Sequence, residues 1–492
     1  MKSWIVNVSL TSICVVAQAQ FIQWNIEHRQ IHRGLTRRSK STFEEVIKNK
    51  RSDGGYFSEV SIGNPPQNVT LQLDTGSSDV WVPWSSASIC KNKTEGECPL
   101  GSFNPDDSDS FKQVGPAMFD ISFIDDSFAK GDYFVDHFEL GGATIKNFTM
   151  GLGVKTDIPF GLIGVGYAIN EALSDMKDIV YPNLPVAMYQ ADYINTIAYS
   201  LWLNDLDASS GNILFGGVDT EKYVGEMSRI DVLPLDGHYY HFIVALTSLV
   251  ASSSSGSDTL ISDSFPIKAV LDSGTTLSYL PQDLSEEIWE EVGAVYSSDY
   301  ELAVLPCSYG RHEGNFTFGF AGPDGPTISV AMDELVIALT DGEIPEFESG
   351  AYRGELVCAF GLQNDTSEVS ILGNSFLRSA YVVYDLVNNE IGIAATDFNA
   401  TDSKIVAFES YGAAIPSATV ASNQQEATQI PTATDNDFTA ADGFQNSDDD
   451  DGNDDSDNGA TLATPPVTSL VLVAATASFM LLGGSIFSIN LS

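Results

Sequence analysis

The sequence predicts an all-β fold built from two related lobes, with only minor helices. Three observations support this prediction. Stretches such as YFSEVSIG (56–63) and NVTLQLD (68–74) alternate in hydrophobicity and are separated by turn-forming Gly, Asn and Pro. Residues 283–295 form the best of the few helical patterns. Finally, one motif occurs twice, far apart in the chain, which indicates two related halves.

The repeated motif reads LQLDTGSSDVWVP at residues 71–83 and AVLDSGTTLSYLP at residues 269–281. In both copies an apolar residue precedes the Asp. The Asp is followed by Thr or Ser, then by Gly, then by two residues that carry hydroxyl groups. A Pro lies nine residues after each Asp. The repeat predicts that each lobe contributes one carboxylate, Asp74 or Asp272, to a shared centre.

A second pair of motifs follows the first. FGLIG (160–164) lies downstream of the first Asp and VSILG (369–373) downstream of the second. An apolar pair that ends in Gly suits a buried strand running close beneath another backbone segment. We expect an N-terminal β-lobe over residues 52–228 and a C-terminal β-lobe over residues 229–408.

The residues after each Asp suit acid–base chemistry. Gly76 and Gly274 permit a tight turn, and the hydroxyls of Ser77 and Thr275 can donate hydrogen bonds to a carboxylate. Two carboxyl groups that lie close together cannot both ionise cheaply, so they share a proton. Such a pair can activate water and protonate a carbonyl, and this chemistry requires neither a metal nor a cofactor.

Residues 1–19 have the features of a secretory signal peptide. Lys2 gives a positive start, residues 4–16 are mostly apolar, and Ala17-Gln18-Ala19 is a small-x-small cleavage site. Its removal also removes Cys14, which leaves an even number of cysteines.

The cysteines that remain are Cys90, Cys98, Cys307 and Cys358. In a secreted protein they predict two disulfides. Three pairings are open, of which one bridge per lobe, Cys90–Cys98 and Cys307–Cys358, is the most economical. A zinc site is disfavoured because the chain has no CxxC spacing with a His cluster.

Six N-glycosylation sequons support a secreted glycoprotein; they begin at Asn68, Asn92, Asn147, Asn315, Asn364 and Asn399.

Residues 20–51 differ in charge from the rest of the chain. They contain eight Lys and Arg against three Glu, a net charge of +5, whereas the whole chain carries −44. The segment ends in Lys50-Arg51, a dibasic pair typical of processing sites. We expect a propeptide that is held over the cleft by charge attraction and released at this pair. The alternative is that residues 20–51 form a disordered, solvated arm.

The strong negative charge argues against nucleic acid as a partner, because phosphate binding requires basic patches.

Residues 409–458 are rich in Ser, Thr, Ala, Gln and Asp and predict a disordered stalk. Residues 459–492 predict a removable GPI-attachment signal, with Asn458 as the attachment residue, a polar spacer and a hydrophobic tail over 470–489. Attachment at Ser456, Asp457 or Gly459 is also open. No Lys or Arg follows the tail, which disfavours a membrane-spanning helix.

From about residue 56 to 394 the chain resembles the pepsin family of aspartic proteases, and its ends resemble the GPI-anchored yapsin-like enzymes of fungi. The doubled DTG/DSG motif and the run ILGNSFLRSAYVVYDLVNNEIGIA (371–394) carry this resemblance. It implies a bilobal β-fold with the cleft between the lobes, an acid pH optimum, peptide or protein substrates, and Asp74 and Asp272 as the catalytic pair. It further implies that Ser77 and Thr275 support the pair, and that Trp81 is the buried Trp beneath a β-hairpin flap.

The flap departs from the family pattern. The family usually has Tyr-Gly-Asp/Thr-Gly there, with the Tyr contacting substrate and bonded to the Trp. The stretch ISFIDDSFAKGDY (121–133) instead places Phe123 at the Tyr position and Asp125 near the tip, and lacks both glycines. We therefore expect an active enzyme with a less ordered flap or a lower turnover.

The sequence is consistent with two functions. The first is a monomeric acid endopeptidase that is exported and GPI-anchored at the plasma membrane or cell wall, with a preference for basic residues that its resemblance to yapsins suggests. The second is a catalytically weak protease-like glycoprotein that binds other molecules or supports the wall. The two Asp residues and the dibasic processing site favour the enzyme.

Overall fold

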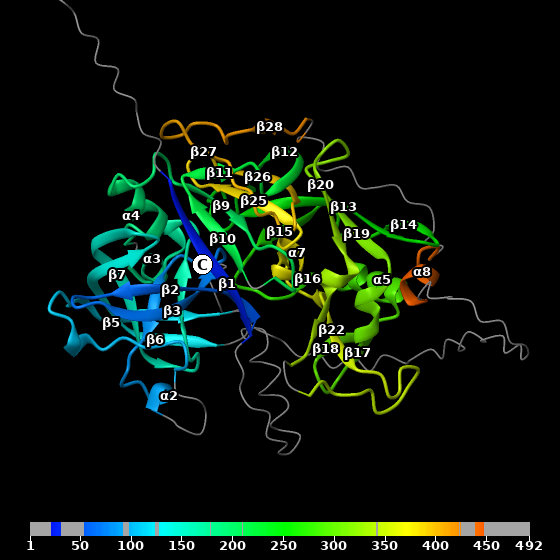
Figure 1. The fold of residues 1–492 in the computed structure, drawn as a ribbon, viewed down its shortest axis with the longest axis horizontal. Coiled ribbons are helices and arrows are strands. Elements are labelled where there is room, and N and C mark those ends of the chain that lie inside the picture. The colour runs from blue at the N-terminus through cyan, green and yellow to red at the C-terminus, as the bar shows by residue number, and fades with distance from the viewer. Residues whose placement is uncertain are drawn as a thin grey trace, which may run out of the picture.

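The computed structural model describes residues 21–30, 54–91, 98–123, 127–177, 179–208, 210–340, 343–422, 424 and 438–446. It confirms the predicted fold class, because strands dominate and form two β-lobes joined by a shared sheet. Figure 1 shows the N-terminal lobe in blue and cyan and the C-terminal lobe in green and yellow. The predicted boundary at residue 228 falls within strand β12 (Tyr223–Asp231) of the shared sheet.

The largest sheet runs from the N-terminal lobe into the base of the molecule. Its order is β28-β12-β26-β25-β9-β10-β1-β2-β3-β8-β4-β7-β6-β5. The strands of the lobe are β2 (Gly54–Ile62), β3 (Gln67–Asp74), β4 (Val80–Pro83), β5 (Lys112–Ser122), β6 (Phe128–Leu140), β7 (Ala143–Thr156) and β8 (Gly161–Gly164). Those of the base are β1 (Ile22–Gln30), β9 (Ala198–Trp202), β10 (Ser210–Phe215), β12, β25 (Ala380–Asp385), β26 (Glu390–Thr396) and β28 (Ala418–Val420).

The C-terminal lobe contains an eight-stranded and a four-stranded sheet. The first comprises β13 (Ile243–Ser253), β14 (Gly256–Leu260), β15 (Ile267–Leu271), β16 (Ser278–Pro281), β19 (Gly314–Phe320), β20 (Thr327–Ala331), β23 (Leu362–Asp365) and β24 (Ser370–Leu372). The second comprises β17 (Val295–Ser297), β18 (Leu302–Pro306), β21 (Val336–Ala338) and β22 (Val357–Phe360). A separate pair joins β11 (Gly217–Asp219) to β27 (Ile405–Ala407).

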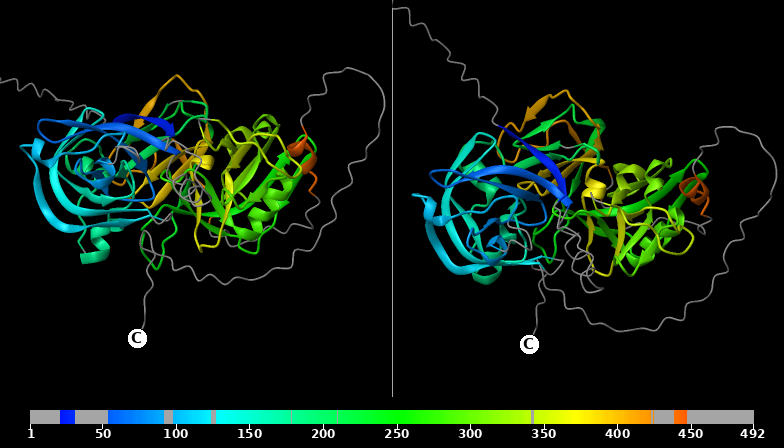
Figure 2. Two further views of the ribbon diagram at one scale, coloured as in Figure 1. Left: turned by 90° about the horizontal axis from the view of Figure 1, so that it is seen from below. Right: turned by 60° about the horizontal axis from the view of Figure 1, so that its bottom comes forward.

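Helices are few and short compared with the strands (Figure 2), and α7 (Asn374–Leu377) lies buried between the lobes, where all four of its residues are inaccessible. They are α2 (Ser88–Lys91), α3 (Ala172–Lys177), α4 (Leu184–Gln190), α5 (Gln282–Val292), α6 (Met332–Leu335), α7 (Asn374–Leu377) and α8 (Ala441–Gln445). The predicted helix at 283–295 is α5, which ends at Val292 and is capped by Gly293 in the left-handed conformation. None of the helices in the described part of the chain is long and apolar enough to cross a membrane.

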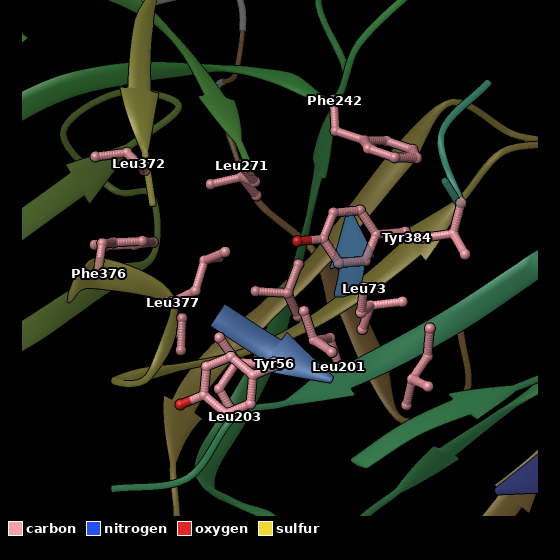
Figure 3. Close-up of a cluster of buried hydrophobic side chains, with 14 of the residues drawn as sticks. Tyr56, Leu73, Leu201, Leu203, Phe242, Leu271, Leu372, Phe376, Leu377 and Tyr384 are labelled. Atoms are coloured by element: carbon pink, nitrogen blue, oxygen red, sulfur yellow. The ribbon is translucent and has the colours of Figure 1, made fainter. Parts of the chain in front are cut away.

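The hydrophobic core continues from one lobe into the other below the two repeated motifs. Figure 3 shows Leu73, Leu271, Phe242 and Tyr384 among the side chains gathered there. The Phe242 and Tyr384 rings pack edge to face with centroids 4.7 Å apart. Because Leu73 and Leu271 each precede one of the predicted catalytic Asp residues, the shared core fixes the relative position of the two motifs.

Both predicted disulfide pairings are present, Cys90–Cys98 in the N-terminal lobe and Cys307–Cys358 in the C-terminal lobe. Of the sequon residues, Asn68, Asn147 and Asn399 are exposed, Asn315 and Asn364 are half-buried, and Asn92 lies outside the described residues.

Two predictions about the ends of the chain require correction. Within the predicted propeptide, residues 22–30 do not cover a cleft; they form strand β1 of the main sheet. Within the predicted disordered stalk, residues 409–422 and 438–446 are structured, and Phe444 is fully buried. In both places average composition concealed a few apolar residues that pack on the lobes. Residues 31–53, which include Lys50 and Arg51, and residues 447–492, which include Asn458, lie outside the described residues.

Candidate active site

The two repeated motifs occupy equivalent positions in the two lobes. β3 ends at Asp74 and runs parallel to β8, which pairs antiparallel with β4. β15 ends one residue before Asp272 and runs parallel to β24, which pairs antiparallel with β16. The predicted downstream motifs FGLIG and VSILG therefore supply the strands β8 and β24, which lie directly beside the Asp-bearing strands.

Each carboxylate is held by its own loop. The backbone N–H of Gly76 donates to Asp74 Oδ1 at 2.8 Å, and the Ser77 hydroxyl donates to Asp74 Oδ2. In the second lobe the N–H of Gly274 donates to Asp272 Oδ1 at 2.8 Å, and Thr275 Oγ1 donates to Asp272 Oδ2 at 2.6 Å. The two motifs thus orient both carboxylates in the same way.

The two carboxyl groups face each other across the lobe boundary. A Cβ at Gly76 would lie 2.6 Å from Asp272 Oδ1, and a Cβ at Gly274 would collide with the carboxyl of Asp74. Each carboxyl therefore packs against the glycine of the opposite loop. Glycine is required at both positions because any side chain would push the carboxyl groups apart.

Thr75 and Ser273, the residues directly after the two Asp, join the loops to each other. Thr75 Oγ1 donates to the carbonyl of Leu271 at 2.9 Å and accepts from the Ser273 N–H at 2.9 Å. Ser273 Oγ donates to the carbonyl of Leu73 at 3.2 Å and accepts from the Thr75 N–H at 3.2 Å. This reciprocal set fixes the distance between the lobes. These hydrogen bonds between the lobes were not predicted from the sequence, although a hydroxyl residue follows the Asp in both copies of the motif.

The electrostatics of the pair favour a shared proton. Asp74 and Asp272 are only 4% and 8% exposed. Burial raises the pKa of Asp74 above its ordinary value, and the adjacent Asp272 carboxylate and a hydrogen bond with it raise it further. The hydrogen bonds from Ser77 and Gly76 oppose this shift but do not reverse it. One proton is therefore retained on the pair well above the pH at which an isolated Asp loses its own.

His241 is a further titratable residue beside the pair. Burial lowers its pKa, while the Asp272 carboxylate and a hydrogen bond to the Gly76 backbone act in the opposite direction. Among the described residues, no group of three or more His, Cys, Asp or Glu side chains is arranged to hold a metal ion.

A buried cluster supports the loop that follows Asp74. Asp79 is fully buried and accepts hydrogen bonds from Tyr133 Oη at 2.7 Å, Tyr181 Oη at 2.6 Å and the Ala172 N–H at 2.8 Å. Two residues further along, Trp81 packs in the same cluster, close to Phe119. The cluster was not anticipated, because Tyr133 and Tyr181 are distant in sequence.

The predicted flap is the hairpin between β5 and β6. The N–H of Phe123 donates to the carbonyl of Ser127 at 2.8 Å, and the Phe123 ring packs against the cluster that contains Trp81. Asp125 lies outside the described residues. Trp81 Nε1 is buried, and no partner among the described residues accepts its hydrogen. Phe123 carries no hydroxyl that could serve as this acceptor.

Phe123 provides a direct test of the flap. Changing Phe123 to Tyr is expected to preserve binding and to raise kcat, since the added hydroxyl offers an acceptor to Trp81 Nε1. Changing Phe123 to Ala is expected to raise KM by removing apolar contact area. Steady-state kinetics on one peptide would measure both effects, with the exposed Phe21→Ala as a control. If the Ala variant matched the wild type in kcat and KM, residue 123 would not belong to the flap.

Comparison with known proteins agrees with this geometry. The family model for eukaryotic aspartyl proteases matches residues 55–396. A probable aspartic-type endopeptidase, opsB, of Aspergillus oryzae is 39% identical over 391 residues, which cover 79% of this chain and 78% of that protein. An acid protease of Saccharomycopsis fibuligera is 34% identical over 346 residues, covering 70% and 81%. Secreted aspartic protease 8 of Candida albicans is 34% identical over 353 residues, covering 71% and 77%. With its doubled Asp motif and this extent of similarity, the chain belongs to the eukaryotic aspartyl protease family and is an aspartic endopeptidase.

Proposed function

We propose that this endopeptidase works at acidic pH on the outer face of the cell, held there by a lipid anchor. The observation that carries the catalytic part is the pair of buried carboxyl groups that face each other. Burial and the adjacent Asp272 raise the pKa of Asp74, which favours one shared proton on the pair. The ionised member accepts a proton from water, and the resulting hydroxide attacks the scissile carbonyl. The protonated member donates to the carbonyl oxygen and so stabilises the tetrahedral intermediate. Collapse of this intermediate transfers a proton to the leaving amine.

The substrates in this proposal are proteins and peptides with basic residues near the cleavage point. The support is the net charge of −44, which attracts cationic chains and repels acidic ones. A random peptide library, digested by the purified enzyme from about pH 3 to about pH 7, tests substrate class and pH range together. We expect internal cleavage beside Lys or Arg and a preference that weakens with added salt. Cleavage with no enrichment of basic residues would contradict the proposed preference.

Latency in this proposal resides in residues 31–51. The described part of the predicted propeptide, residues 21–30, contains Arg29. Its guanidinium lies 2.6 Å from Glu27 Oε2, so the two charges cancel. The whole net charge of +5 therefore belongs to residues 31–51. This basic segment is attracted to the acidic lobes until a processing protease cuts after Lys50-Arg51, and lower pH weakens the attraction by protonating the carboxylates.

The anchor in this proposal follows a shorter stalk than composition suggested. Residues 438–446 dock on the C-terminal lobe, where the Phe444 ring stacks on Phe316 with centroids 5.3 Å apart. His312 Nδ1 lies 2.7 Å from the Phe444 carbonyl oxygen, and the N–H of Ala440 donates to Asp258 Oδ2 at 2.7 Å. The tether to the membrane or wall therefore begins after residue 446, at the far edge of the C-terminal lobe.

Two truncations separate anchoring from docking. Deleting residues 447–492 is expected to release active enzyme into the medium with an unchanged melting temperature. Deleting residues 438–492 should also release the enzyme. It should lower the melting temperature, because loss of Phe444 would expose the surface around Phe316 that its ring covers. Phosphatidylinositol-specific phospholipase should release the full-length form from intact cells. Finding residues 470–492 by mass spectrometry in the mature membrane-bound protein would contradict the GPI anchor.

A further inference from the structure

Strand β1 is inserted between two strands that belong to different parts of the main sheet. Residues Ile22–Glu27 pair antiparallel with β10, and residues Glu27–Gln30 pair antiparallel with β2. Ile22, Trp24 and Ile26 alternate along the strand and are 8%, 7% and 0% exposed. The carbonyl of Asn25 accepts a hydrogen bond from Ser58 Oγ at 2.7 Å. β1 is therefore packed as a core strand, although it lies upstream of the predicted processing site.

β1 is also the only described strand that connects the two portions of this sheet. In the hydrogen-bonded order it stands between β10, on the side of the base, and β2, on the side of the N-terminal lobe. The additional pairing of the sheet, β2 with β6, lies wholly within the N-terminal lobe. Removal of β1 would leave β10 and β2 with unpaired edges and would expose the apolar positions that Ile22, Trp24 and Ile26 cover.

The chain downstream of the processing site cannot replace β1. After a cut at Arg51 only Ser52 and Asp53 precede Gly54, the first residue of β2. Two extended residues span about 7 Å, whereas the nine residues of β1 extend over about 30 Å. The new N-terminus is therefore too short to fold back along β2 and fill the slot beside β10.

We propose that the slot between β2 and β10 retains residues 22–30 after processing, so that the mature protease consists of two non-covalently associated chains. This rests on the proposed cleavage after Lys50-Arg51. A dibasic-specific endoprotease hydrolyses the Arg51–Ser52 peptide bond with one water, leaving a carboxylate on Arg51 and an amine on Ser52. The short chain remains bound by backbone pairing on both edges and by its three buried side chains, a mode known as β-augmentation. Its basic part, residues 31–51, is free to leave the lobes or to be trimmed.

The first test is the composition of the mature enzyme. Enzyme purified under native conditions, released from cells or secreted without its anchor, is analysed by mass spectrometry after denaturation. We expect one short chain that includes residues 22–30 for each long chain that begins at Ser52, and co-elution of the two in gel filtration. An active long chain that begins at Ser52 and lacks the short chain would overturn the proposal. A single chain uncut at Arg51 would overturn it through its premise, the cleavage, while leaving the catalytic function intact.

The second test uses matched charge substitutions in β1. Ile26→Asp places a carboxylate at a fully buried position, whereas Asn25→Asp adds the same charge on the exposed face of the same strand. We expect Ile26→Asp to reduce the short chain recovered per long chain by more than about tenfold, with a parallel loss of activity. Asn25→Asp should behave as the wild type. If Ile26→Asp is not secreted, stepwise urea treatment of the wild type replaces it: release of the short chain should coincide with loss of activity. Activity that survives complete release would refute the role of β1.

Discussion

Replacing Asp74 or Asp272 with Asn is expected to abolish peptide hydrolysis while the protein still folds and is exported. Asn retains the shape of Asp, and its amide oxygen can accept the hydrogen bond that the Gly76 or Gly274 N–H donates. Its NH2 group can donate to the hydroxyl oxygen of Ser77 or Thr275, which reverses the second hydrogen bond. It cannot hold the proton that the pair shares, so neither the activation of water nor the protonation of the carbonyl proceeds. Loss of such a group costs about 10²–10⁴-fold in rate or more.

The matched control for these variants is Asp207→Asn, which removes one carboxylate from an exposed position. It should hydrolyse peptides as the wild type does. Circular dichroism and the melting temperature show that each inactive variant is folded. Near-normal turnover by either Asp74→Asn or Asp272→Asn would remove that residue from the mechanism.

The second large effect is a loss of stability as the pH rises. Glu171 and Glu291 are fully buried, and desolvation raises their pKa values to about 9 and about 8. A raised folded-state pKa means that the folded protein binds more protons than the unfolded chain over this range. The stability that these groups contribute is complete below about pH 4.5 and is lost as the pH rises toward 8 or 9. Each such group reduces the free energy of unfolding by about 1.4 kcal/mol per pH unit within its window.

Glu171→Gln isolates one of these contributions. The amide oxygen can still accept the hydrogen bond that the Tyr181 N–H donates to Glu171 Oε2, and the side chain no longer ionises. We expect wild type and variant to melt at similar temperatures near pH 5 and the variant to melt higher near pH 8. The exposed Glu221→Gln is the control. If the melting temperature fell by the same amount in the wild type and in Glu171→Gln between about pH 5 and about pH 8, Glu171 would not retain its proton in the folded protein.

The sequence was most informative where a signal repeats. The two DTG/DSG motifs predicted the Asp pair and the hydroxyl groups that bond to it, because these hydrogen bonds lie within three residues of each Asp. The backbone N–H groups of Gly76 and Gly274 were not predicted as donors. The Thr75–Ser273 hydrogen bonds and the bonds from Tyr133 and Tyr181 to Asp79 were not foreseen. They join residues far apart in the chain, and a single sequence contains no information on which distant residues meet.

The sequence was misleading where composition was averaged over long segments. The charge of residues 20–51 concealed the alternation of Ile22, Trp24 and Ile26, which by itself predicts a strand. The Ser, Thr and Asp content of residues 409–458 likewise concealed Phe444, whose ring packs on Phe316 and, together with hydrogen bonds from Ala440 and His312, docks residues 438–446. In both segments the alternation or placement of a few apolar side chains was the better indicator.

The dependence of kcat/KM on pH tests the central claim most directly, namely that Asp74 and Asp272 share one catalytic proton. The measurement uses one soluble peptide and confirms at each pH that the enzyme is folded. We predict a bell-shaped profile with its maximum in the acid range. The rate should fall at low pH as both carboxyls become protonated, and at higher pH as the pair loses the proton that burial and Asp272 keep on Asp74. A folded enzyme whose rate is independent of pH, or rises steadily into the alkaline range, would contradict the shared proton and with it the proposed mechanism.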